Sequence, residues 1–175
     1  GFGLSNDERV GSTASFAPAF RIARRAGLVG VPHGGELLGP SSVREVVSAL
    51  APARLGHGVR TSEDPALLRA VVDAGIALEV CPTSNVHLGV YTDFSQVPLP
   101  TLMSAGARIA LAADDPLLFR SRLVAQYEVA RDVFDLSDQA LADLARSSID
   151  ASLASPSRKA AWNADIDAWL AEPAA

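Results

Sequence analysis

The sequence has almost no cysteine, since Cys81 is the single one among 175 residues. One cysteine cannot form an internal disulfide, and it excludes a zinc site built from Cys-x-x-Cys pairs. Disulfide-stabilised secreted domains and zinc fingers are therefore excluded. Such sparse cysteine also fits a reducing compartment, so we expect a cytoplasmic protein.

Long apolar runs, basic clusters and phosphate-binding loops are missing too. No apolar run approaches the roughly 18 residues of a membrane span, and the densest basic spot is Arg24-Arg25. The formal net charge of −5 argues against nucleic acid or an anionic membrane as the main partner. Neither G-x-G-x-x-G nor G-x-x-x-x-G-K-[ST] occurs. What remains is a globular composition, 49% hydrophobic and 20% charged, that can fill a core.

Short apolar segments alternate with amphipathic ones along the chain, which predicts strands alternating with helices. Ser12 is the expected N-cap of the first helix, Ser42-x-x-Glu45 reads as a capping box, and Ser137 is the expected cap of a late helix. The strands are expected to end near residues 4, 33, 57, 81 and 114, and the helices to cover 14–27, 42–50, 64–74, 98–105, 118–134, 137–153 and 158–171.

Strands that alternate with helices predict a parallel sheet of right-handed βαβ units, either an open sheet or a (β/α)₈ barrel. All five expected strand ends carry polar or ionisable residues, including Ser84-Asn85 after the fourth. A barrel brings all its C-terminal strand ends to one site, whereas an open sheet uses one crevice. The polar ends therefore favour an α/β fold of the TIM (β/α)₈ barrel type.

Two of the three histidines, His33 and His57, lie at expected strand ends beside glycines. Glu36 follows His33 across two glycines, and the acidic pair Asp114-Asp115 follows another strand. Imidazole and carboxylate groups that meet at the mouth of a barrel are typical of a divalent metal site, with zinc favoured. A lone histidine at a strand end is more often structural, and Asp115 can equally cap the next helix, so these alternatives stay open. The third histidine, His87, is expected in a loop.

Four motifs together carry a resemblance to a known family. In order they are His33-Gly-Gly-Glu36, Leu55-Gly-His57-Gly58, Cys81-Pro-Thr-Ser-Asn85 and Asp114-Asp-Pro116. This series resembles the adenosine deaminase family of the amidohydrolase superfamily, from about Gly3 to Leu170. The resemblance implies a zinc-dependent aminohydrolase that converts an adenine-type nucleoside, such as adenosine, into its oxo product and ammonia.

The resemblance also implies roles for single residues. Two would bind Zn²⁺, namely His33 and Asp114. His57 would orient or deprotonate the attacking water, and Glu36 would protonate ring nitrogen N1. The residues expected to bind the purine nucleoside are Asn6, whose backbone N–H would face N3, and Asp115, which would share a hydrogen bond with N7.

Two departures limit what the resemblance implies. The family's first metal ligands form a His-x-His pair, and no His-x-His occurs here. The chain begins with Gly1 rather than Met, so we expect residues 1–175 to be the C-terminal portion, about strands four to eight, of one deaminase barrel domain. The N-terminal half, in the same or another chain, would supply the missing histidines, and this part alone would neither bind zinc tightly nor be active.

The second departure is Asn6, where the family carries glycine. This leaves the substituent on the purine open. A modified adenine nucleoside such as aminodeoxyfutalosine is one alternative substrate. A catalytically incomplete half-barrel with only a structural role, or a metal-free protein that binds a small ligand, are the alternatives from other functional classes.

Overall fold

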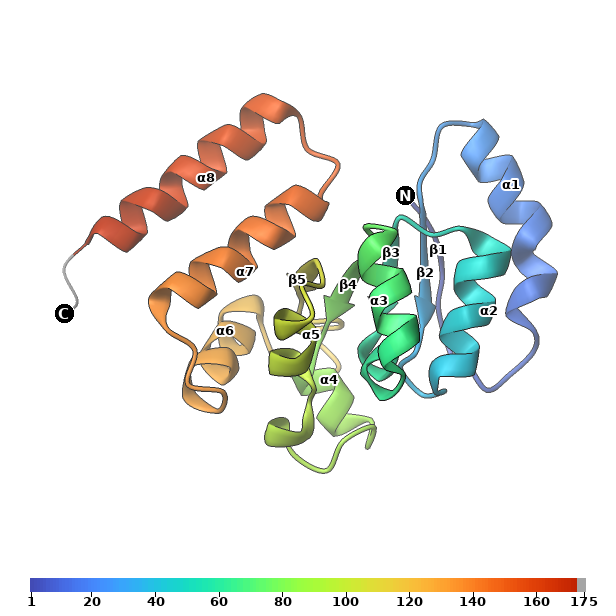
Figure 1. Cartoon of the computed structure of the whole chain (residues 1–175), viewed down its shortest axis with the longest axis horizontal. Coiled ribbons are helices and arrows are strands. Elements are labelled where there is room, and N and C mark those ends of the chain that lie inside the picture. The colour runs from blue at the N-terminus through green and yellow to red at the C-terminus, as the bar shows by residue number, and fades with distance from the viewer. Residues whose placement is uncertain (173–175) are drawn as a thin grey trace.

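The computed structural model describes residues 1–172 and contains one parallel sheet flanked by helices (Figure 1). The Pro-Ala-Ala end, for which the sequence predicts fraying, lies outside the described residues. Each strand pairs in parallel with the next one along the chain. The strands are β1 (Phe2–Leu4), β2 (Gly30–Gly34), β3 (Arg54–His57), β4 (Ala77–Val80) and β5 (Ile109–Leu111).

The strand order decides between the two expected architectures. In the sheet the order is β1-β2-β3-β4-β5, the same as in the sequence. A doubly wound open sheet reverses its direction of growth at a switch point, whereas a barrel adds each new strand on the same side. Right-handed crossovers in one direction place the connecting helices on one face. The chain therefore has the winding of a (β/α)₈ barrel, with five of its parallel strands present.

The helices follow the predicted order, with corrected boundaries. The helix expected from residue 118 begins only at Leu123, and a short helix that the sequence analysis missed follows β4. The helices are α1 (Ala17–Arg25), α2 (Pro40–Leu50), α3 (Pro65–Asp73), α4 (Pro82–His87), α5 (Leu99–Ser104), α6 (Leu123–Asp132), α7 (Asp138–Ala151) and α8 (Pro156–Ala171), with 3₁₀ turns η1 (Thr13–Phe16), η2 (Val59–Glu63) and η3 (Phe94–Gln96).

Local sequence explains several helix starts. Proline occupies the first turn of α2, α3, α4 and α8, where its missing N–H costs no hydrogen bond. Asp64 caps α3 by accepting from two backbone N–H groups, and the predicted cap Ser137 accepts from the N–H of Ala140. These ends therefore form for the reasons that sequence patterns capture.

The capping box predicted at Ser42 is wrong. Helix α2 begins at Pro40 with Gly39 at its N-cap and no side-chain cap. The carboxylate of Glu45 reaches a different segment, where Oε1 accepts from the hydroxyl of Ser12 at 3.3 Å and from the N–H of Ala14 at 3.0 Å. A tertiary contact with the turn before α1 thus replaces the expected local one.

The two faces of the sheet differ in burial. Along β2, alternate positions are buried, while Val31 and His33 are half-buried. The buried side packs with the helices around Phe20, Leu50 and Leu78, which are almost fully enclosed. Helix α1 turns the face that carries Phe20 and Ala23 toward this core, whereas Phe16 and Ile22 are 45% and 68% exposed. The half-buried side, which carries His33, leads to the candidate site.

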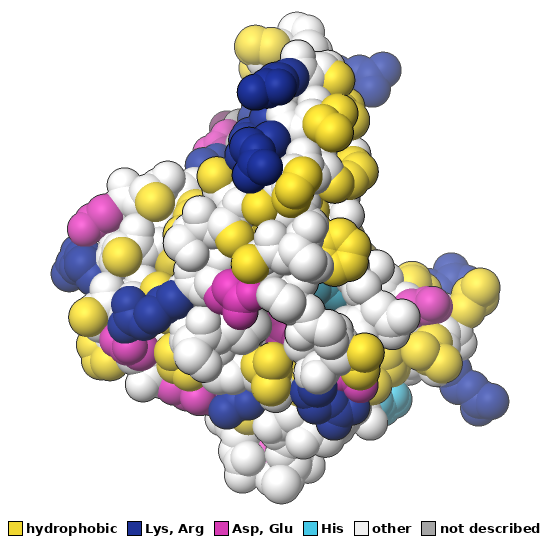
Figure 2. Space-filling view, turned by 90° about the vertical axis from the view of Figure 1, so that its right-hand side faces the viewer, with side chains coloured by type: hydrophobic (Ala, Val, Ile, Leu, Met, Phe, Trp, Pro, Cys, Tyr) yellow, Lys and Arg dark blue, Asp and Glu magenta, His cyan; other side chains and the backbone are white. Residues whose placement is uncertain are grey.

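Among residues 1–172, no helix combines the length and the apolar character needed to cross a membrane. On the face that Figure 2 shows, hydrophobic, acidic and basic side chains lie interspersed.

Candidate metal centre and active site

Two imidazoles meet where β2 and β3 end. The register pairs His33 with Gly56, so that the ring of His33 lies across the neighbouring strand. Its centroid is 4.9 Å from that of His57, with the planes at 82°. A Cβ at residue 56 would lie 2.5 Å from Cδ2 of His33, so only glycine leaves room for the ring in this position.

Two carboxylates converge on the second of these imidazoles. Nε2 of His57 lies 3.4 Å from Oε1 of Glu36 and 3.9 Å from Oδ2 of Asp114. His57 is 2% exposed and Glu36 is 5% exposed, and Oε1 of Glu36 has no hydrogen-bond partner in the described part of the chain. The structure thus brings together four of the six predicted site residues, from three different strand ends.

The donor set fits a divalent metal. His33, Glu36 and His57 each present one ligand atom, and these atoms lie within 4.8 Å of one another. Asp114 adds a carboxylate beside His57. Two imidazoles with carboxylates match the preference of zinc, and a buried carboxylate oxygen without a partner is a group that a cation would satisfy.

Burial sets the protonation of the centre. Burial, with the nearby charges of Asp114 and Glu8 acting in the same direction, raises the pKa of Glu36 to about 7. Burial also lowers the pKa of His57 to about 4, with the neighbouring His33 acting in the same direction. A carboxyl group that can hold a proton therefore faces a neutral imidazole near neutral pH, which is an arrangement suited to acid–base chemistry.

The backbone is strained at the same places. Asn6, His57 and Asp114 adopt left-handed conformations with φ of 96°, 63° and 58°. Such conformations cost a residue other than glycine on the order of 1 kcal/mol, and they cluster at functional sites. Three of the six predicted site residues have this conformation, as do Ala51, Arg120 and Asp135 outside the predicted set. Asparagine, aspartate and histidine adopt it more readily than other side chains do.

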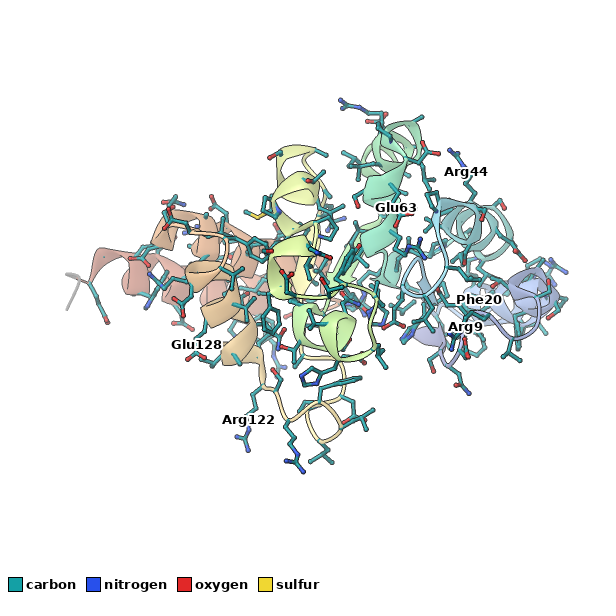
Figure 3. All side chains as sticks on the ribbon, turned by 90° about the horizontal axis from the view of Figure 1, so that it is seen from below. Arg9, Phe20, Arg44, Glu63, Arg122 and Glu128 are labelled. Carbon is teal, nitrogen blue, oxygen red and sulfur yellow. The ribbon has the colours of Figure 1, made fainter. Side chains whose placement is uncertain are left out.

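A cavity of about 310 Å³ adjoins the centre and is lined by Asn6 and His33 together with the loop after β1. Its size is at the lower end of small-molecule sites. Figure 3 looks from below and shows Arg9 of this loop near α1, well separated from Arg122, which lies just before α6. A larger cavity of about 430 Å³ lies between α6, α7 and α8, away from the imidazoles, and its mainly apolar lining offers no converging ligands.

Asp115 is tied to its own loop. Its Oδ1 accepts hydrogen bonds from the backbone N–H groups of Leu117 at 3.0 Å and Leu118 at 2.9 Å. These bonds close a turn within the loop, whereas the next helix begins only at Leu123 with Arg122 at its N-cap, so the alternative that Asp115 caps that helix is wrong. Asn6 also makes a local bond, in which Oδ1 accepts from the N–H of Asp7 at 2.9 Å.

Sequence reasoning missed two residues of the site. Asn85 is fully buried, and its Nδ2 lies 3.4 Å from Nδ1 of His57. It stands in the predicted Cys-Pro-Thr-Ser-Asn motif, which forms most of α4 rather than a plain strand end, with His87 as the last residue of that helix. The proline at its start was the available signal. Glu8 is the second, and it binds the backbone of the segment that carries Glu36.

The chain is similar to known proteins over almost its whole length. The family model described as "Adenosine deaminase" matches residues 1–169. A putative adenosine/adenine deaminase of Streptomyces virginiae is 56% identical over 170 residues, which are 97% of this chain and 50% of the relative. The crystal structure of an adenine deaminase from Arthrobacter aurescens superimposes with a TM-score of 0.94 at 31% identity, covering 98% of this chain and 53% of that one.

A further similar structure is that of an amidohydrolase from Burkholderia ambifaria with bound Zn. It superimposes with a TM-score of 0.85 at 25% identity, and the match covers 95% of this chain and 47% of that chain. The chain thus spans about half the length of the relatives that it matches. The predicted resemblance is confirmed by the family match, the identity and the superposition together, and the chain belongs to the adenosine deaminase family of amidohydrolases.

Proposed function

We propose that the barrel containing this chain catalyses the zinc-dependent hydrolytic deamination of an adenine ring, with adenosine giving inosine and ammonia. The observation that carries the proposal is the buried pair of Glu36 and His57, whose Oε1 and Nε2 lie 3.4 Å apart, with His33 and Asp114 beside them. In this proposal His33 and Asp114 are metal ligands. When bound, zinc lowers the pKa of a water molecule toward neutrality and so provides a nucleophile at physiological pH.

The chain's own residues supply the proton transfers. His57, kept neutral by a lowered pKa, accepts a proton at Nε2 from the water that attacks C6. Glu36, with its pKa raised to about 7, donates its proton to N1 and so avoids a full negative charge on the ring. His57 then passes its proton to the amino group, which leaves as ammonia when the C6–N bond breaks, and the proton of the new C6 hydroxyl group returns to Glu36 as the C=O bond forms. Each positioned proton transfer contributes about 10²–10⁴ in rate. Asn6 and Asp115 bind the purine at N3 and N7.

Free adenine is the second candidate substrate. It is favoured by the similarity to the adenine deaminase of Arthrobacter aurescens. Asn6, which lines the cavity beside His33, also narrows that cavity compared with the glycine of the family pattern. A narrower cavity favours a purine without a sugar.

Activity in this proposal needs the other half of the barrel. The chain covers half of its relatives' length, and its donor set lacks a His-x-His pair. The partner half, in the same or another polypeptide, supplies these ligands and the remaining strands. By itself the 175-residue chain neither holds zinc tightly nor releases ammonia.

The test joins this chain to the complementary N-terminal half of the Streptomyces virginiae relative in one polypeptide. Zinc content and ammonia release from adenosine, adenine and aminodeoxyfutalosine are measured for the complete barrel and for the chain alone. We expect zinc and activity only in the complete barrel, and loss of both in a His33→Ala variant. Normal turnover by the chain alone would refute the need for the second half, and a zinc-loaded barrel inactive on all three substrates would favour a purely structural role.

A further inference from the structure

Local sequence does not fix the conformation of the segment 35–39, which carries Glu36. This segment follows Gly34, the last residue of β2, and begins with Gly35, which adopts a φ of 74°. The next regular element, α2, begins only at Pro40. Two glycines leave the backbone many alternatives, so another part of the molecule has to fix the position of Glu36.

Glu8 provides that fixed point. Its Oε2 accepts hydrogen bonds from three successive backbone N–H groups, those of Glu36 at 3.2 Å, Leu37 at 2.8 Å and Leu38 at 2.9 Å. Glu8 lies in the loop after β1, 28 residues away from Glu36. An ionised carboxylate that accepts several N–H groups makes strong bonds with defined geometry.

The opposite side of the same segment is held by Arg60 from η2. Its guanidinium NH1 donates to the carbonyl of Leu37 at 2.9 Å, and its backbone N–H donates to the carbonyl of Gly35 at 3.0 Å. Glu8 therefore accepts hydrogen bonds from the N–H groups of this segment, and Arg60 donates hydrogen bonds to its carbonyl groups.

The side chain of Glu36 has no such anchor of its own. Its Oε1 is buried without a hydrogen-bond partner among the described residues and faces Nε2 of His57 at 3.4 Å. The direction of the carboxyl group thus depends on its backbone. We propose that Glu8 is a positioning residue for Glu36, acting through the three N–H groups that it accepts. This inference depends on the proposed role of Glu36 as the proton donor.

Two variants separate the hydrogen bonds of Glu8 from its charge. Glu8→Ala removes the acceptor, whereas Glu8→Gln keeps a carbonyl oxygen that can accept the same N–H groups. In the zinc-loaded complete barrel, we expect Glu8→Ala to lower kcat about 10- to 100-fold, as loss of an outer-shell partner does, with KM and zinc content nearly unchanged. Glu8→Gln should retain most of the activity.

A double-mutant cycle with Glu36→Gln tests whether Glu8 acts through Glu36. If it does, Glu8→Ala causes no further loss of kcat in the Glu36→Gln background, because coupled residues are not additive. A merely structural role would lower kcat by the same factor in both backgrounds. Asp64→Ala is a matched control, since Asp64 also accepts two backbone N–H groups, at the start of α3, and its loss should leave kcat unchanged.

Amide hydrogen exchange gives a readout that does not need activity. In Glu8→Ala the amides of Leu37 and Leu38 should exchange faster, and in Glu8→Gln they should remain protected. Unchanged kcat and exchange in Glu8→Ala, or equal losses in the Ala and Gln variants, would overturn the inference. If Glu36→Gln alone leaves full activity, the proposed role of Glu36 fails and the inference with it, while the exchange result still shows whether Glu8 holds the segment.

Discussion

Replacing Glu36 with glutamine should make the metal-free chain more stable, and increasingly so as the pH rises. The pKa of this carboxyl group is 4.5 when exposed and about 7 in the folded chain, mainly because of burial. Between these values the folded state holds a proton that the unfolded state has lost. Stability therefore falls as the pH rises through this window, because deprotonation favours the unfolded chain.

The size of the effect follows from the shift in pKa. From 4.5 to about 7, at about 1.4 kcal/mol per unit, the cost reaches about 3 kcal/mol above neutral pH. Glutamine has the same shape and no charge to bury. The free energy of unfolding of Glu36→Gln should thus equal that of the parent near the lower pKa and exceed it by about 3 kcal/mol at mildly alkaline pH.

His57 changes stability in the opposite direction. Its pKa is lowered from 6.5 to about 4, so the unfolded chain binds the proton first and the folded chain loses stability as the pH falls through that range. Above about pH 6.5 this imidazole is neutral in the folded and the unfolded chain alike, so the difference between the two proteins in that range reports the contribution of Glu36.

The assay is urea unfolding with a chelator present, at pH values from about 5 to about 8. Glu128→Gln makes the same chemical change at an exposed position of α6, labelled in Figure 3, and should alter stability by less than about 0.5 kcal/mol throughout. A difference between Glu36→Gln and its parent that stays constant or shrinks with rising pH would refute the reasoning.

Three further predictions concern packing and hydrogen bonds. Gly56→Ala should weaken zinc binding by the complete barrel about 10- to 100-fold in equilibrium dialysis, because the new Cβ displaces the ring of His33, and unchanged affinity would contradict this. Glu45→Ala should lower the free energy of unfolding in urea by about 1 kcal/mol, and Ser42→Ala should lower it by less than about 0.5 kcal/mol. A larger loss for Ser42→Ala than for Glu45→Ala would instead support the capping box. Gln126→Leu should cost about 2–3 kcal/mol, since it breaks a buried network between α4 and the segment before α6, and a thermal midpoint unchanged from the parent would argue against that network.

The sequence predicted those parts of the structure that depend on local patterns. Apolar runs that end in polar residues marked all five strands, and the order of the motifs placed His33, Glu36, His57 and Asp114 at strand ends that do converge. The parallel sheet follows from the alternation of elements. The polar strand ends favoured a barrel over an open sheet, and the strand order, which sequence does not display, confirmed it.

The hydrogen-bond partners that sequence missed join segments that lie far apart in the chain. Glu8 and Glu45 each accept backbone N–H groups from another loop, and no local pattern marks such a partner. Glu45 was even assigned to a local capping box, because the motif fits and the competing tertiary contact is invisible in sequence. Asn85 stood in a motif already singled out, but its distance to His57 depends on α4.

The order of the strands also bears on how the chain folds. Because each strand pairs only with its neighbour in sequence, every pairing closes a loop of a single βα unit. Pairings with short separation form early and quickly, so this half can grow one unit at a time, as a chain leaving the ribosome does. If such a barrel is divided into two halves, each half loses strand pairing only at its first and its last strand. A protein of this winding can therefore be assembled from halves that have each completed most of their own folding.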